Sequence, residues 1–219
     1  MSDDVIIGRD GRPRCAWAGA GDTALSSYHD QVWGARTYDE AAMFEALPLG
    51  VFEVGLSWSV MFGKRDAFRG FDVTDVAAMT ERDVDRLVTD ASIIRNRGKI
   101  QATIDNARAM SSASPSLAAL AKSFEITRTR APRSIADLPS STPQAEVFAK
   151  QLKSQGYRFV RPTSVYAFMQ NIGIVRPARG LGRRATQGRH HGPVGPASAH
   201  HRLLDDRTGR LPFHPTGIA

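Results

Sequence analysis

Apolar residues recur at helical spacing along most of the first 175 positions of the chain. Phe52, Leu56 and Val60 follow one another at every fourth position, which places them on one side of a helix. The same spacing appears in further apolar groups at residues 43–47, 84–88, 100–107, 147–152 and 166–172. The chain has no internal repeat, and no alternation of apolar and polar residues is long enough to predict a β-strand. The pattern therefore predicts an all-α fold.

Residues that start or stop helices separate these groups. Thr37 and Glu40 have the spacing of a capping box, in which two side chains satisfy backbone N–H groups at the start of a helix. Pro48 lacks a backbone donor, so we expect the helix there to kink or restart before Val51. Pro143 suits the first position of a later helix. The last helix is expected at about residues 164–173.

The helical pattern ends after Val175. Residues 176–219 hold eight arginines, two acidic residues, no lysine, seven glycines, five prolines and five of the six histidines of the chain. This composition is typical of a disordered segment. We therefore expect a flexible N-terminus at residues 1–12, a helical domain at 13–175 and a disordered basic tail at 176–219.

Charge and cysteine content exclude several classes of protein. The net charge is +7, but the tail alone carries +6 of it, so the basic excess is weak evidence for nucleic-acid binding by the helical domain. A single cysteine excludes an intrachain disulfide. No apolar run approaches the roughly 18 residues of a membrane span, and the acidic start at residues 1–4 is not a secretory signal. We expect a cytoplasmic, monomeric protein with no membrane partner.

Four large aromatic residues, Trp17, Tyr28, Trp33 and Trp58, lie in the first 60 positions and include every tryptophan of the chain. Large aromatic side chains most often belong to a core. A pocket for a nucleobase flipped out of a duplex also needs such rings, together with a polar group that reads the base edge. The pattern alone favours the core and leaves the pocket as the alternative.

The segment at residues 93–100 predicts a tight link between two helices. Gly98 and Lys99 stand where the second helix starts, and backbone N–H groups at such a start can bind a phosphate oxygen. Arg95, Arg97 and Lys99 add positive charge. These features match a helix–hairpin–helix that grips the DNA backbone without reading sequence. A plain helical corner with solvated charges explains them equally well.

Cys15 and His29 are candidate metal ligands. Cys15 is the single cysteine, and His29 is the one histidine before the tail. A structural zinc site needs four nitrogen or sulfur ligands, and these two residues fall short of that number. A buried thiol beside a hydrogen-bonded imidazole is the simpler interpretation unless histidines of the tail contribute.

Taken together, five separated motifs resemble the bacterial 3-methyladenine DNA glycosylase I family over roughly residues 13–175. The motifs are Arg14-Cys15-Ala16-Trp17, Tyr28-His29-Asp30 with Trp33-Gly34, Gly55-Leu56-Ser57-Trp58, residues 93–101 and residues 166–170. The resemblance implies a fold of the helix–hairpin–helix superfamily. It also implies a monofunctional glycosylase that cuts the N-glycosidic bond of 3-methyladenine in alkylated double-stranded DNA and needs no catalytic cofactor.

The resemblance assigns roles to the aromatic residues by position. Trp58 is expected to stack on the flipped base and Tyr28 to hydrogen-bond near it, while Trp17 and Trp33 form walls of the pocket. Alkylation at N3 gives the purine a positive charge, so the base is already a good leaving group. Electron-rich rings then favour the charged base through cation–π attraction.

The chain departs from the family pattern at the residue that reads the purine edge. A Glu stands five residues before the Gly-Leu-Ser-Trp motif in the family, and this chain has Gly50 there. Glu53 is three residues further on, near enough on a continuous helix to be a candidate substitute. An alternative function is therefore a DNA-binding relative that has lost base recognition.

A second departure concerns zinc. The family pattern combines an N-terminal Cys and His, matched here by Cys15 and His29, with a His and a Cys just after the last helix. Neither follows Val175 at the expected place. The abrupt change of composition at Arg176 is what a reading-frame shift in a GC-rich gene would produce. We expect weak or absent zinc binding, and a third reading is a frameshifted product that folds poorly.

Overall fold

The structure is a computed structural model that describes residues 5–53, 58–68, 72–126 and 138–175. The tail expected at 176–219 lies outside these ranges, as does the Gly-Leu-Ser part of the motif that ends at Trp58. The described helices are α1 Ala24–Gln31, α2 Glu40–Glu53, α3 Trp58–Phe62, α4 Val73–Ala78, α5 Glu81–Leu87, α6 Arg97–Ser112, α7 Leu117–Ser123, α8 Pro143–Ser154 and α9 Pro162–Asn171, with short 3-10 helices at Ala16–Ala18 and Arg65–Phe68.

A two-stranded antiparallel hairpin precedes the helices. Strand β1 (Val5–Ile7) pairs with β2 (Pro13–Cys15), with Val5 opposite Cys15 and Ile7 opposite Pro13. Part of the segment expected to be a flexible N-terminus is therefore a strand. Three residues are too few to produce an alternating pattern, so the sequence pattern did not indicate it. All other regular elements in the described ranges are helices, and the predicted all-α class is confirmed.

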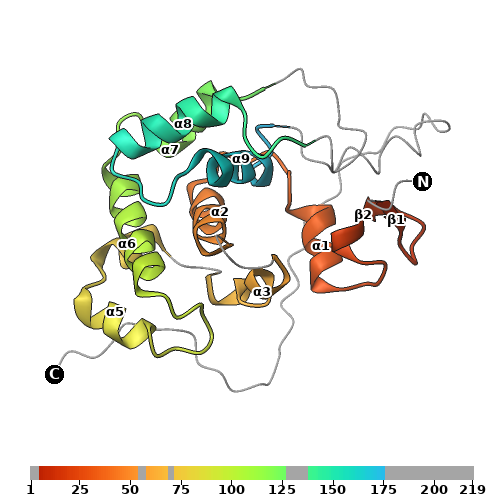
Figure 1. The fold of residues 1–219 in the computed structure, drawn as a ribbon, viewed down its shortest axis with the longest axis horizontal. Coiled ribbons are helices and arrows are strands. Elements are labelled where there is room, and N and C mark those ends of the chain that lie inside the picture. The colour runs from red at the N-terminus through yellow and green to blue at the C-terminus, as the bar shows by residue number, and fades with distance from the viewer. Residues whose placement is uncertain (1–4, 54–57, 69–71, 127–137, 176–219) are drawn as a thin grey trace, which may run out of the picture. The chain divides into compact units, whose positions relative to one another are not determined.

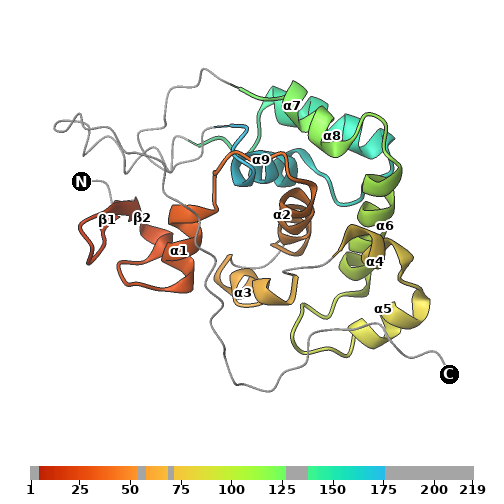
Figure 2. The same ribbon diagram turned by 180° about the vertical axis from the view of Figure 1, so that it is seen from behind.

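Helix α2 packs against α3, α6, α7 and α9, and it lies between α9 and α3 in both views (Figures 1 and 2). It runs without interruption through Pro48, so the expected restart before Val51 does not occur. Its start also differs from the prediction, because the Asp39 carboxylate accepts the backbone N–H of Ala42 at 2.8 Å. Asp39 is thus the capping residue, in place of Thr37.

Other helix starts agree with the sequence pattern. Thr142 caps α8 by accepting the Ala145 N–H, and Pro143 occupies the first turn. The buried stripe of α8 differs slightly from the prediction, because Val147 is 47% exposed while Phe148 and Leu152 are buried. Among the residues that the structure describes, no helix is both long enough and apolar enough to span a membrane.

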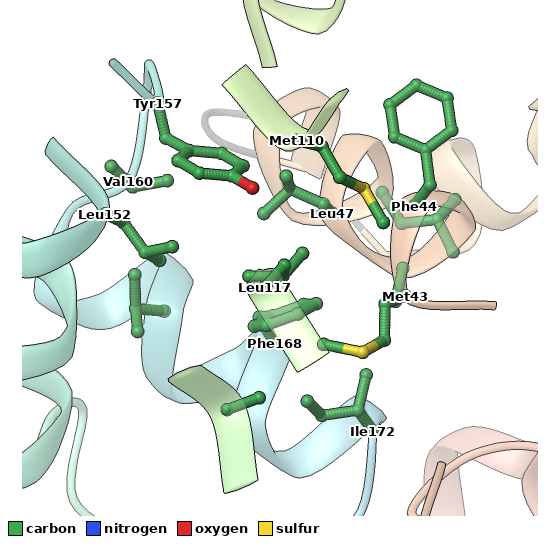
Figure 3. Packing of buried hydrophobic residues seen from close by; sticks show 14 of the residues in the cluster. Met43, Phe44, Leu47, Met110, Leu117, Leu152, Tyr157, Val160, Phe168 and Ile172 are labelled. Carbon is green, nitrogen blue, oxygen red and sulfur yellow. The ribbon is translucent and has the colours of Figure 1, made fainter. Parts of the chain in front are cut away.

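The main core forms where α2 meets α6, α7, α8 and α9 (Figure 3). Met43 and Leu47 enter it from α2, and Phe168 enters it from α9. Burial of side chains of this size stabilises the fold by roughly 1.5–3 kcal/mol each relative to exposure. Helix α2 therefore contributes side chains both to this core and, through Glu45, to the candidate site.

Candidate active site

The hairpin and α1 bring three aromatic rings together. The ring centres of Trp17 and Trp33 are 5.2 Å apart with their planes nearly perpendicular, and His29 lies 5.2 Å from Trp17 and 5.6 Å from Trp33. Ring contacts of this kind add stability beyond that gained by burying apolar surface. Both views show α1 beside the hairpin (Figures 1 and 2). Two of the four predicted pocket residues therefore share one cluster.

Arg14 and Asp30 anchor this cluster to the hairpin. Arg14 is 6% exposed, and its guanidinium donates to both oxygens of Asp30 and also to Asp10. Asp30 in turn lies 2.9 Å from Nδ1 of His29. The hydrogen bonds from Arg14 lower the pKa of the Asp30 carboxyl from 3.8 to about 2. Asp30 is therefore ionised at neutral pH and orients the His29 ring.

Cys15 and His29 are both buried and adjacent. The backbone N–H of Cys15 points at Nε2 of His29 over 3.4 Å. Within residues 5–53, 58–68, 72–126 and 138–175, no cluster of three or more His, Cys, Asp or Glu side chains is arranged to hold a metal ion. A structural zinc ion takes four ligands. The described residues supply two candidates, so they do not by themselves fit a zinc ion.

Tyr28 lies in the middle of α1 and contacts residues of α3, α9 and the 3-10 helix Arg65–Phe68. Its hydroxyl donates to Oδ1 of Asn171 at 2.6 Å, across 143 positions of sequence. The Arg65 guanidinium lies over the ring, 4.6 Å from its centre, and the Phe62 ring is 5.3 Å away. Arg65 is paired with Glu45 of α2 at 2.5 Å. The position of Tyr28 is thus fixed by residues from three separate segments.

A cavity of about 60 Å³ adjoins this cluster. Its lining includes Tyr28, Glu45, Arg65 and Asn171. The cavity is large enough to hold ordered water beside these polar side chains.

Gly50 leaves room for a side chain on α2. A Cβ placed there would lie 3.7 Å from the carbonyl oxygen of Ser164, which is ordinary van der Waals contact. Glu53 is the last residue of α2 and Trp58 the first of α3. Their side chains are outside the description, so the roles predicted for Glu53 and Trp58 stay predictions.

The link between α5 and α6 ends in a capped helix start, as predicted. Asn96 caps α6, and its side chain accepts the Lys99 N–H at 3.1 Å. Arg95 and Gly98 are exposed, as a phosphate contact requires. Arg97 instead forms ion pairs with Glu81 and Asp85 of α5. The charge of Arg97 is therefore shared with neighbouring carboxylates.

The Lys99 side chain is placed differently from the prediction. Only 8% of the residue is exposed, and Nζ donates to the carbonyl oxygen of Phe52 at 2.9 Å. Burial lowers the pKa of Lys99 below 10.5. In the first turn of a helix a long side chain folds back toward the helix start, and here that direction leads to the end of α2. The Lys99 ammonium is thus inside the protein and not on the surface where a phosphate would bind.

The comparisons with known proteins cover most of the described chain. Residues 17–178 match the methyladenine glycosylase family. The DNA-3-methyladenine glycosylase 1 of Escherichia coli (strain K12) is 39% identical over 174 residues, which are 74% of this chain and 91% of that protein. The chain belongs to the methyladenine glycosylase family. The DNA-3-methyladenine glycosylase of Haemophilus influenzae is 33% identical over 172 residues, covering 74% and 92% of the two chains.

Solved structures agree with this membership of the glycosylase family. A crystal structure of 3-methyladenine DNA glycosylase I superposes with a TM-score of 0.69 at 40% identity, covering 74% of this chain and 94% of that one. A 3-methyladenine DNA glycosylase I variant solved in complex with 3-methyladenine gives 0.65 at 28% identity, covering 72% and 90%. The resemblance seen in the sequence motifs is confirmed.

Within this glycosylase, the sequence motifs did not reveal the residues that surround Tyr28. Glu45, Arg65 and Asn171 lie far from it in sequence, and no local pattern marks them. Arg65 stands in a short polar stretch after an apolar run, where a solvated side chain is the usual expectation. Only its burial beside Glu45 shows that it belongs to the site.

Proposed function

We propose that this protein is a DNA-3-methyladenine glycosylase, which repairs alkylated double-stranded DNA by base excision. It hydrolyses the N-glycosidic bond that joins 3-methyladenine to deoxyribose, and it leaves an abasic site. One observation carries this conclusion. The match to the methyladenine glycosylase family spans residues 17–178. It therefore contains the aromatic cluster, Tyr28 and the link between α5 and α6 in one continuous domain.

The chemistry suits a site built from aromatic rings. The positive charge of the N3-alkylated purine weakens its glycosidic bond and attracts it to electron-rich rings. The flipped base is expected to meet Trp58 and Tyr28, with Trp17 and Trp33 as walls. Tyr28, which donates its proton to Asn171, is expected to hydrogen-bond near the base.

We assign binding of the DNA backbone to the link between α5 and α6. Arg95 and Gly98 are both exposed, and contacts from them to phosphate oxygens would supply affinity without sequence preference. Cytoplasmic location and a monomeric state go with this activity, because the bacterial substrate is chromosomal DNA and one domain contains the pocket and the hairpin. Cys15 and His29 supply two of the four ligands of a structural zinc site, so the site is incomplete without two further ligands.

Release of 3-methyladenine from methylated duplex DNA, followed by chromatography of the free base, tests the function. Trp58→Ala serves as the paired variant, and loss of its stacking face is expected to lower the rate by about tenfold to a hundredfold. Wild-type protein that releases no base would contradict the proposal. Unchanged release by Trp58→Ala would remove Trp58 from the pocket.

The second candidate is a binding-only relative. The observation that favours it is Gly50, since the family pattern places a base-reading carboxylate at that position. Donors on a bound base that find no acceptor cost about 1–3 kcal/mol each. A wild-type protein that binds duplex DNA with strong salt dependence, melts cooperatively and yet releases no base would establish this candidate.

A further inference from the structure

The hydroxyl of Tyr28 is held by the last residue of α9. It donates to Oδ1 of Asn171 at 2.6 Å, and the two residues are 143 positions apart in sequence. This distance lies within the usual range for an O–H···O hydrogen bond. Tyr28 is 4% exposed, and both residues line the cavity of about 60 Å³. Asn171 therefore fixes a hydroxyl that lies at the wall of the candidate site.

Backbone contacts hold the end of α9 against the segment that follows α1. The carbonyl oxygen of Asn171 accepts the Gly34 N–H at 3.0 Å, and that of Ile172 accepts the Thr37 N–H at 3.1 Å. Gly173 allows this close approach, because a Cβ there would lie 2.7 Å from a backbone nitrogen of the segment. Its φ of 72° is also one that residues with a side chain rarely adopt. Asn171 is thus joined to the α1 side through main-chain atoms as well as through Tyr28.

The ring of Tyr28 has a separate support. The Arg65 guanidinium lies 4.6 Å from the ring centre, and its pairing with Glu45 holds it there. Arg65 therefore restrains the face of the ring, whereas Asn171 restrains the hydroxyl at its tip. Such restraint matters for a group that meets a reacting base, because a small displacement removes much of the effect of a positioned group.

We propose that Asn171 is a positioning residue for base excision, which acts by holding the Tyr28 hydroxyl in the orientation that meets the flipped base. The proposal rests on the proposed glycosylase function, in which Tyr28 hydrogen-bonds near the base. It gives Asn171 no contact of its own with the base. Substitution of Asn171 consequently weakens binding and release of the base only while the Tyr28 hydroxyl is present.

A double-mutant cycle separates this role from a structural one. Asn171→Leu removes the acceptor at similar size, and Asn171→Asp keeps an acceptor oxygen at the same place. Tyr28→Phe removes the hydroxyl, and Tyr28→Phe with Asn171→Leu completes the cycle. Gln151→Leu changes an exposed amide of α8 and is the control. Each protein is assayed for single-turnover release of 3-methyladenine from methylated duplex and for its melting temperature.

Asn171→Leu is expected to slow base release by about threefold to tenfold, which is the effect of one lost hydrogen bond. In the Tyr28→Phe background the same substitution should change the rate by less than about twofold, because no hydroxyl remains to be positioned. Asn171→Asp should recover most of the wild-type rate, and Gln151→Leu should keep all of it.

Two results would overturn the positioning role. The first is an equal fold loss from Asn171→Leu with and without the Tyr28 hydroxyl, which would make Asn171 a purely structural residue. The second is an equal loss in Asn171→Leu and Asn171→Asp that follows their melting temperatures, since the acceptor oxygen would then be irrelevant.

Binding of free 3-methyladenine, measured by calorimetry, keeps this proposal separate from the proposed function. Affinity should fall in Asn171→Leu and should not fall further when Asn171→Leu is added to Tyr28→Phe. This pattern in a protein whose wild type releases no base from DNA would contradict the glycosylase function and leave the positioning role intact. Wild-type release with unchanged rate and affinity in Asn171→Leu would do the reverse. A wild-type protein that neither binds nor releases the base would contradict both.

Discussion

The guanidinium of Arg65 lies over the ring of Tyr28, 4.6 Å from its centre, while Glu45 pairs with the same guanidinium at 2.5 Å. The pair joins α2 to the short 3-10 helix after α3. A positive charge beside a pocket for a cationic base would weaken binding of that base. The Glu45 carboxylate offsets this charge, so the two residues hold Tyr28 in place without making the pocket positive.

Arg65→Met should lower the free energy of unfolding by about 2–3 kcal/mol, because it leaves the carboxylate of Glu45 without its buried partner. Urea unfolding measures this loss. The double variant Arg65→Met with Glu45→Leu should recover a large part of it, since no unpaired charge remains. Equal stability of the single and double variants would show that the pair contributes through packing and not through charge.

Gly50→Glu should raise the rate of 3-methyladenine release by about tenfold, because a carboxylate can accept hydrogen bonds from the base edge. The space beside Gly50 admits a Cβ without displacement of the Ser164 carbonyl. Single-turnover base release is the measurement. Gly50→Ala is the control, and it should stabilise the helix by up to about 1 kcal/mol without a gain in rate. The same rate in both variants would contradict base reading at this position.

Arg95→Ala should weaken binding to every duplex sequence and lower the salt slope by about one, because an exposed phosphate contact is lost. Arg97→Ala should change the slope less, because Glu81 and Asp85 already share its charge. Fluorescence anisotropy of labelled duplex at several salt concentrations measures both slopes. A larger effect for Arg97→Ala would mean that DNA draws Arg97 away from α5.

Asp30→Asn should remove part of the acid dependence of stability. The folded pKa of Asp30 is about 2 and the unfolded value is 3.8, so its stabilising contribution is complete above about pH 4 and disappears as the pH falls through 2. A difference of this size corresponds to about 2 kcal/mol at neutral pH. Urea unfolding at pH values from about 2 to 7 should show a weaker acid loss in the variant. Asp75→Asn, at an exposed position of α4, is the control.

Zinc binding is expected to be weak or absent, because Cys15 and His29 supply two of the four ligands that a structural site takes. Histidines of the tail, such as His190 and His191, would have to be ordered at about 1–2 kcal/mol for each residue fixed. Deletion of residues 180–219 should therefore leave the melting temperature nearly unchanged. Metal analysis that finds one tightly held zinc per chain, lost on that deletion, would contradict this prediction.

Much of the fold follows from local sequence. Apolar residues at every third or fourth position are sufficient to indicate a helix, and Thr142 caps its helix through atoms only three residues away. The family motifs are equally local, since each is a short run of neighbouring residues. The all-α class and the glycosylase family were therefore available from the sequence alone.

The placement of charged side chains was decided only by the tertiary structure. From the sequence, Lys99 and Arg65 are both expected to be solvated. In the structure, Lys99 is buried against Phe52 and Arg65 against Tyr28. Their partners lie tens of positions away, so no local pattern contains them. Whether a charge faces water or a helix end depends on how helices pack, and that packing is set by the whole core. The sequence alone therefore determined which helices form and which family they belong to, whereas the packing of the helices determined which charged side chains are buried.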